Sequence, residues 1–218
     1  MPLTLMDAQL FVKLNVYGSV LTIMACYITA QVMGHVDSWL PMISDCFVYP
    51  PESYVSRFGV VSFINYGVLM SNVLIVRCSD LSVSAQRVLY ALSCVTGISF
   101  GLVGSISEGD NLTVHNMFAL SGFMTYGIFL ALIHFQAKRR VPLMICLYNA
   151  LSVLQIWCAV SDSYVSAKPL AEWLLSALFA YNILNLSGRL KNKSIQLQSS
   201  YDSVLIQSML IRDDSTMC

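Results

Sequence analysis

Hydrophobic residues fall in six long runs that are separated by short polar stretches. A helix of about 20 apolar residues crosses the hydrocarbon core of a membrane, and each run is close to that length. The pattern predicts an all-α fold, a bundle of six transmembrane helices with a cytosolic tail. The expected spans are 14–33, 58–76, 88–106, 114–135, 141–160 and 169–186, within a transmembrane domain of residues 1–187 and before a tail of residues 188–218.

The composition supports a membrane protein. Hydrophobic residues make up 56% of the chain and charged residues 11%, whereas a soluble domain has about a quarter charged residues. The first hydrophobic run lacks the basic start and small-residue cleavage site of a signal peptide. We therefore expect it to be a retained span. We expect no nucleic-acid partner.

The basic residues predict the orientation. With six spans, one face of the membrane carries both termini and most of the lysines and arginines, and basic residues gather on the cytosolic side. Both termini are therefore expected in the cytosol. The residues on this face are Lys13, Arg77, Arg87, Lys138, Arg139, Arg140, Arg189, Lys191, Lys193 and Arg212, against Arg57 and Lys168 on the outer face.

Histidines and carboxylates gather in the predicted outer loops and at the outer ends of spans. Such side chains can bind a metal ion or act as acid and base on a lipid. They can also cap helix ends and connect the loops by hydrogen bonds, and we favour this structural interpretation. We therefore predict no catalytic residue, cofactor or metal. The candidate cluster is His35, Asp37, Asp45, Glu52, His115 and Glu172, with Asp162 nearby in the sequence.

Four short motifs indicate packing, modification and sorting. Gly97 and Gly101 form a G-x-x-x-G that allows close helix packing. Asn111 begins a glycosylation sequon on the predicted outer side. Cys78, at a cytosolic helix end, is a candidate palmitoylation site. Tyr201 and Val204 match the tyrosine-x-x-bulky pattern that endocytic and lysosomal sorting adaptors read.

Three stretches resemble one family. They are "GHVDSWLPMISDCFVYPPES", "VHNMFALSGFMTYG" and "AEW", in this order along the chain. Together they resemble the DRAM family (damage-regulated autophagy modulators) of the Frag/DRAM/Sfk group of six-span membrane proteins, over roughly residues 21–187. The chain differs where family members carry Thr-Gly-Thr, because it has Cys46, Phe47 and Val48 there. Met117 and Phe118 likewise replace small residues.

The resemblance implies a function without catalysis. It implies a multi-pass membrane protein that modulates autophagy at lysosomes or endosomes. Two alternatives remain open: a plasma-membrane or Golgi regulator of phosphoinositide or GPI-lipid metabolism, and a lipid-binding or lipid-modifying protein that uses the outer cluster. The expected partners are membrane lipids, sorting adaptors and other membrane proteins.

Overall fold

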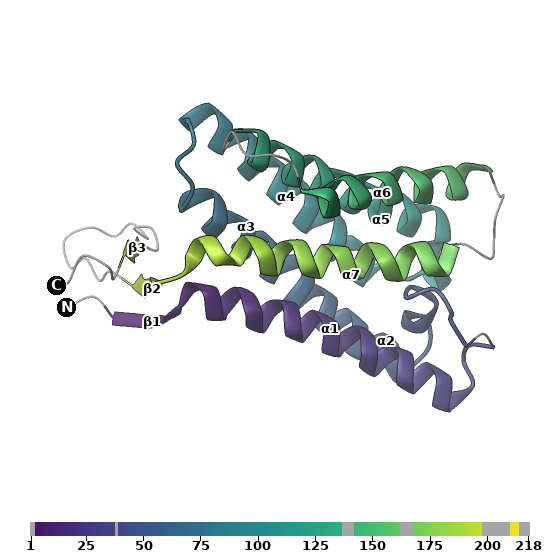
Figure 1. Ribbon diagram of the computed structural model, residues 1–218. Coiled ribbons are helices and arrows are strands. Elements are labelled where there is room, and N and C mark those ends of the chain that lie inside the picture. Colours follow the sequence, from purple (N-terminus) through teal and green to yellow (C-terminus); the bar gives the residue numbers. More distant parts are fainter. Residues whose placement is uncertain (1–2, 38, 137–141, 162–167, 198–209, 214–218) are drawn as a thin grey trace.

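The fold is a bundle of long helices with a small sheet at one end (Figure 1). The computed structural model describes residues 3–37, 39–136, 142–161, 168–197 and 210–213. Its α-helices are α1 (Ala8–Met33), α2 (Glu52–Gly59), α3 (Gly67–Arg77), α4 (Val83–Ser105), α5 (Glu108–Gln136), α6 (Leu143–Ser161) and α7 (Lys168–Ser187). Two short 3₁₀ helices, η1 (Asp45–Phe47) and η4 (Gly188–Leu190), and one π-helix, η2 (Val60–Tyr66), complete the helical elements of these ranges.

Within the described residues, four helices are long and apolar enough to cross a membrane. They are Ala8–Met33, Glu52–Arg77, Val83–Ser105 and Glu108–Gln136. The second of these consists of α2, η2 and α3, which follow one another without a break. An apolar stretch of α6, Leu143–Cys158, is shorter. The predicted all-α class and multi-pass membrane character are thus confirmed, while the number of six spans stays a prediction.

The helices form a ring in which each packs on its neighbours in the sequence. α1 contacts α2 and α3, α3 contacts α4, α4 contacts α5, α5 contacts α6, and α6 contacts α7. α7 then packs against α1, and Figure 1 shows these two helices side by side along their length. We call the end that holds residues 34–37 and 39–51 the loop end, and the opposite end, which holds β1 and β2, the terminal end.

Helix α1 has a defined start and stop. Asp7 is its N-cap, and the Asp7 carboxylate accepts a hydrogen bond from the Leu10 amide at 2.6 Å. Gly34 ends the helix with φ of 69°, a left-handed conformation that costs glycine little. The next amide, of His35, donates back to the Ala30 carbonyl at 2.9 Å. This sharp stop directs the following residues over the loop end.

Helix α5 begins with a short turn and then a kink. The Ser107 amide donates to the Asp110 carboxylate at 2.9 Å, and the Asp110 amide donates to the Ser107 hydroxyl oxygen at 3.2 Å. This reciprocal pair is a capping box. Asn111 is then extended, and its side-chain oxygen accepts from the Val114 amide at 3.1 Å. Two consecutive caps therefore precede the long straight part of the helix.

The π-helix η2 packs against the glycines of α4. A Cβ added to Gly101 would lie 2.5 Å from the side-chain nitrogen of Asn65, Nδ2. One added to Gly97 would lie 3.2 Å from the side-chain oxygen of Asn65. The predicted G-x-x-x-G therefore serves contact between two helices of one chain. π-Helical turns are rare and occur frequently at functional sites, and Val60 and Ile64 of η2 line the cavity described below.

A small sheet joins the two ends of the chain at the terminal end. β1 (Leu3–Asp7) pairs antiparallel with β2 (Lys193–Leu197), which pairs with β3 (Leu210–Asp213). The sequence pattern predicts no strand here and places residue 188 onward in a cytosolic tail. Strands of four or five residues carry little periodicity, and the partner of β1 lies at the other end of the sequence. The first part of the tail thus packs on the transmembrane domain.

Candidate functional site

Residues 34–51 fold back across the loop end and are held there by the start of α7. The Trp173 indole nitrogen donates to the Pro41 carbonyl at 2.9 Å. The neighbouring Glu172 carboxylate accepts a hydrogen bond from the Ile43 amide at 2.8 Å. Two adjacent residues of one helix thus hold two points of this loop in place. We call the loop the cover, because it lies across the loop end of the bundle.

His35 of this cover is partly exposed and pairs with the buried Glu52 at the start of α2. His35 Nδ1 contacts Glu52 Oε1, and the imidazole also lies against the Tyr49 ring, with 5.1 Å between ring centroids. Glu52 is only 1% exposed, and its Oε2 has no hydrogen-bond partner among the described residues. Because a buried carboxylate is costly without a partner, His35 is its main stabilising contact.

His115 belongs to a second, separate polar group. It is 2% exposed, and its Nδ1 lies 2.7 Å from the Ile106 carbonyl oxygen. A carbonyl only accepts hydrogen bonds, so Nδ1 carries the proton in this contact. The other ring nitrogen, Nε2, lies 3.8 Å from Glu108 Oε1. In the neutral imidazole, Nε2 is therefore an acceptor that faces a carboxylate.

The six residues of the predicted cluster do not form one site. His35 pairs with Glu52, while His115 and Glu172 line a common cavity. The Asp45 carboxylate accepts from the Met42 amide at 3.1 Å and lies near the Glu108 and Glu172 carboxylates, and Asp37 is exposed. Asp162 lies outside the described residues. Among the residues with assigned positions, no three His, Cys, Asp or Glu side chains are arranged to hold a metal ion.

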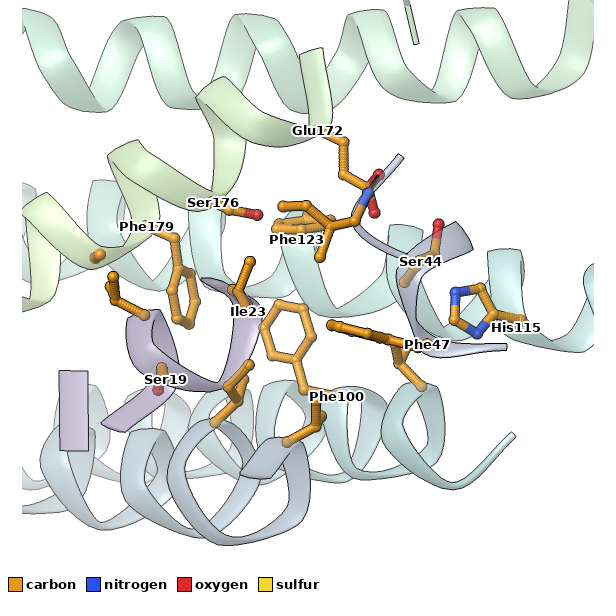
Figure 2. Close-up of a pocket in the computed structure, with 17 residues that line it drawn as sticks. Ser19, Ile23, Ser44, Phe47, Phe100, His115, Phe123, Glu172, Ser176 and Phe179 are labelled. Atoms are coloured by element: carbon orange, nitrogen blue, oxygen red, sulfur yellow. Dashed lines mark hydrogen bonds between the residues drawn. The ribbon is translucent and has the colours of Figure 1, made fainter. Parts of the chain in front are cut away.

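A cavity of about 90 Å³ lies beneath the cover and inside the ring of helices. Figure 2 shows the Glu172, Ser44 and His115 side chains gathered on one side of it. Aromatic rings fill much of the remaining wall, and they come from the loop and from α4, α5 and α7. These rings are Phe47, Phe100, Phe123 and Phe179. The cavity thus has one polar end and an apolar body.

The polar end continues into a smaller cavity of about 30 Å³. Ser44, His115 and Glu172 line both spaces, and Glu108, Asn116 and Gln155 are added in the smaller one. Ser44 is 3% exposed, and its hydroxyl lies beside the Glu108 carboxylate. The Gln155 side-chain oxygen is buried and has no hydrogen-bond partner among the described residues.

The apolar body continues in the other direction, into a groove of about 150 Å³ between α1 and α7. Val20, Ile23 and Ser176 line both the groove and the cavity. Met24 and Ala177 line the groove and are exposed on the surface of the bundle. The groove and the cavity therefore adjoin each other across these shared residues, and the groove lies on the apolar outer surface of the bundle.

The environment of Cys46 shows how strongly the cover excludes water. This side chain is 1% exposed, and its thiol donates to the Met42 carbonyl at 3.5 Å. Burial raises the pKa of the Cys46 thiol to about 12, with smaller contributions from the nearby Asp45 and Glu172 carboxylates. The thiol therefore stays protonated at physiological pH, and it is a packing residue of the cover.

The remaining predicted sites lie away from the cavity. Asn111 and the following residues of its sequon are exposed at the loop end. Cys78 is half-buried at the end of α3, next to the apolar core. Tyr201 and Val204 lie outside the described residues.

Sequence reasoning missed three residues of the polar end: Ser44, Glu108 and Gln155. Serine and glutamine carry no distinctive chemical signal, and Glu108 precedes the kink at Asn111, so helical spacing could not align it with His115. The available signal was that Gln155 is a polar residue inside an apolar run, since such residues mark contacts or pathways.

These observations define a polytopic helical membrane protein with a covered cavity next to a groove between α1 and α7. The family model described as Frag1/DRAM/Sfk1/Cwh43P N-terminal domain matches residues 10–186. The chain therefore belongs to this family, as its sequence motifs predicted. No curated protein and no solved structure matches the chain.

Proposed function

We propose that this chain is a non-enzymatic membrane protein that binds a lipid in the covered cavity and thereby modulates autophagy and lysosomal or endosomal function. The observation that supports lipid binding is the connected shape of the site. An apolar body leads from a buried polar end to a groove between α1 and α7. Ligand sites of this kind are largely apolar with a few polar groups that fix orientation.

The contacts of the two outer histidines favour binding over catalysis. His35 contacts a buried carboxylate, and His115 Nδ1 donates to a backbone carbonyl. A histidine that activates a serine or cysteine nucleophile needs that side chain within hydrogen-bond reach, and neither contact is of that kind. Holding a lipid, by contrast, needs nothing beyond the cavity and its polar end.

Blocking the cavity tests lipid binding. Ser176 lines both cavity and groove, so Ser176→Phe would fill the passage. Leu174→Phe is the matched control, because Leu174 is exposed on the same helix and lines neither space. Native mass spectrometry of the protein, extracted in mild detergent, should show a retained lipid in the wild type and in Leu174→Phe but not in Ser176→Phe. A wild type that carries no lipid would refute the proposal.

The compartment and the process rest on the family resemblance and on the sorting motif. We propose that both termini are cytosolic and that adaptors read Tyr201 there. Tyr201→Ala should then move a tagged protein from lysosomes and endosomes to the cell surface, whereas Tyr181→Ala in the transmembrane domain should not. If lipid binding supports autophagy, Ser176→Phe should also reduce autophagic flux in cells that lack the wild-type protein. Unchanged localisation or flux would contradict the corresponding part.

A further inference from the structure

We propose that the occupant of the cavity is a long-chain primary amine without a phosphate, that is, a lipid of the sphingoid-base class. This inference rests on the proposed function, because it names the chemistry of the lipid bound at the same site. Its ammonium group would lie among Glu108, Glu172 and His115, with the hydrocarbon chain along the apolar body toward the groove between α1 and α7.

The polar end is rich in acceptors. It contains the Glu108 and Glu172 carboxylates and, in the neutral imidazole, His115 Nε2. The side-chain oxygen of Gln155 is buried and has no partner among the described residues. Because buried polar atoms are nearly always hydrogen-bonded, this oxygen indicates that a ligand or water completes the site. A primary ammonium, with three N–H donors, matches such a set.

The charges of the lining residues favour a cation. Glu108 and Glu172 line the same small cavity, and no lysine or arginine lines that cavity, the larger one or the groove, as far as the chain is described. The Ile43 amide satisfies part of the Glu172 carboxylate, but an amide brings no full positive charge. Two carboxylates that line one small cavity repel each other, and an ammonium between them would offset this repulsion.

The same charges argue against a phosphate. Phosphate recognition in proteins uses arginine, lysine or a free helix N-terminus. The nearest described arginine of the loop end, Arg57, is partly exposed and bound to Asp110 at 3.1 Å. A phospholipid would bring its phosphate next to two carboxylates without a basic side chain. An amine lipid without a phosphate avoids this repulsion.

A competition experiment with the purified full-length protein tests the head group. The probe is a photoactivatable sphingosine, and the competitors are sphingosine, ceramide, sphingosine 1-phosphate and phosphatidylethanolamine. Ceramide keeps the chain but has no positive charge. We expect sphingosine to compete at least about tenfold better than ceramide, which loses a charge-assisted hydrogen bond. We expect a similar advantage over the other two lipids, which keep an amine but bring a phosphate next to the carboxylates. Cross-linked peptides should include residues 20–24 or 173–180.

Two variants locate the ammonium group. Glu108→Gln and Glu172→Gln each keep the side-chain shape and remove a charge, so each should weaken sphingosine binding about tenfold. Asp37→Asn is the matched control, because Asp37 is an exposed carboxylate of the same loop end that lines none of the three spaces. Thermal unfolding of each variant shows whether the variant remains folded. If a variant does not fold, the competition experiment with the wild-type protein still tests the head group.

The outcomes separate this inference from the proposed function. If ceramide competes as well as sphingosine, lipid binding stands and the amine assignment is wrong. If sphingosine 1-phosphate or phosphatidylethanolamine competes as well, lipid binding stands and the exclusion of a phosphate is wrong. If both glutamine variants bind sphingosine as the wild type does, the ammonium group does not lie among these carboxylates and the inference is overturned. If no lipid is retained and Ser176→Phe changes nothing, both proposals are refuted.

Discussion

The Trp173 indole nitrogen donates a hydrogen bond to the Pro41 carbonyl, 2.9 Å away, and so holds the cover to the first turns of α7. The Trp173 ring also meets the Tyr27 ring edge to face, with centroids 5.6 Å apart. The Tyr27 hydroxyl in turn donates to the Trp39 carbonyl at 2.8 Å. Helices α1 and α7 therefore each donate a hydrogen bond to the same segment of the cover.

Replacing Trp173 by phenylalanine should weaken the cover. The variant loses the hydrogen bond to Pro41 and keeps an aromatic ring against Tyr27. The free energy of unfolding in detergent should fall by about 1 kcal/mol. Tyr181→Phe, at an exposed position of the same helix, should leave it unchanged. Equal stability of the Trp173→Phe variant and the wild type would show that the bond contributes nothing.

His35→Ala should destabilise the protein more than removal of both members of its pair. Without His35, the carboxylate of Glu52 stays buried and loses its described partner, at a cost on the order of 3 kcal/mol. The double variant His35→Ala with Glu52→Gln carries no buried charge and should recover part of this loss. Denaturant unfolding of the single and double variants measures the difference. A double variant less stable than His35→Ala would disprove the explanation.

Gly101→Val should disturb the contact between α4 and η2. Its Cβ would lie 2.5 Å from the side-chain nitrogen of Asn65. Such overpacking lowers the free energy of unfolding by about 1–3 kcal/mol. Gly188→Ala is a suitable control, since its Cβ would meet no atom within 4 Å. Thermal unfolding should separate the two, and size-exclusion chromatography should show the same oligomeric state for both. A changed oligomeric state in Gly101→Val alone would instead place this motif at an interface between chains.

Cys46 should resist alkylation in the folded protein. With a pKa of about 12, only about one thiol in ten thousand is ionised at pH 8, compared with roughly a quarter for an ordinary thiol. The reaction of Cys46 with maleimide should therefore be slow at pH 8, rise with pH toward 12, and become fast in the denatured chain. Mass spectrometry of the labelled peptides follows this residue. Equal rates in the folded and denatured protein would contradict the buried position.

A glycan on Asn111 would fix the orientation of the chain. The Asn111 oxygen caps Val114, whereas a glycan attaches to the side-chain nitrogen, so both can coexist. Thr113→Ala should abolish the glycan and leave the cap intact, while Asn111→Gln should abolish the glycan and also cost about 1 kcal/mol. Glycosidase digestion and gel mobility detect the change. A glycan at Asn192, at the terminal end, would reverse the proposed orientation.

The spans could be predicted because crossing a membrane is a requirement on length and hydrophobicity alone. The helix ends were less accessible, since they depend on caps: α1 begins at Ala8 behind Asp7, ahead of the predicted start at residue 14. The candidate site depends on contacts between distant positions. The Glu172 carboxylate meets an amide 129 residues earlier in the sequence, and a cavity exists only where side chains from several helices leave space. Neither a contact between distant residues nor a cavity produces a periodic pattern in the sequence.

The closure of the ring by α1 and α7 has a mechanical consequence. The other neighbouring helices of the ring are consecutive in the chain, whereas α1 and α7 are the first and last helices. The groove therefore lies at a seam that no short covalent link crosses. The bonds from Glu172 and Trp173 hold this seam at one end, and the pairing of β1 with β2 holds it at the other. Between these two sets of contacts, α1 and α7 can move apart without stretching a loop.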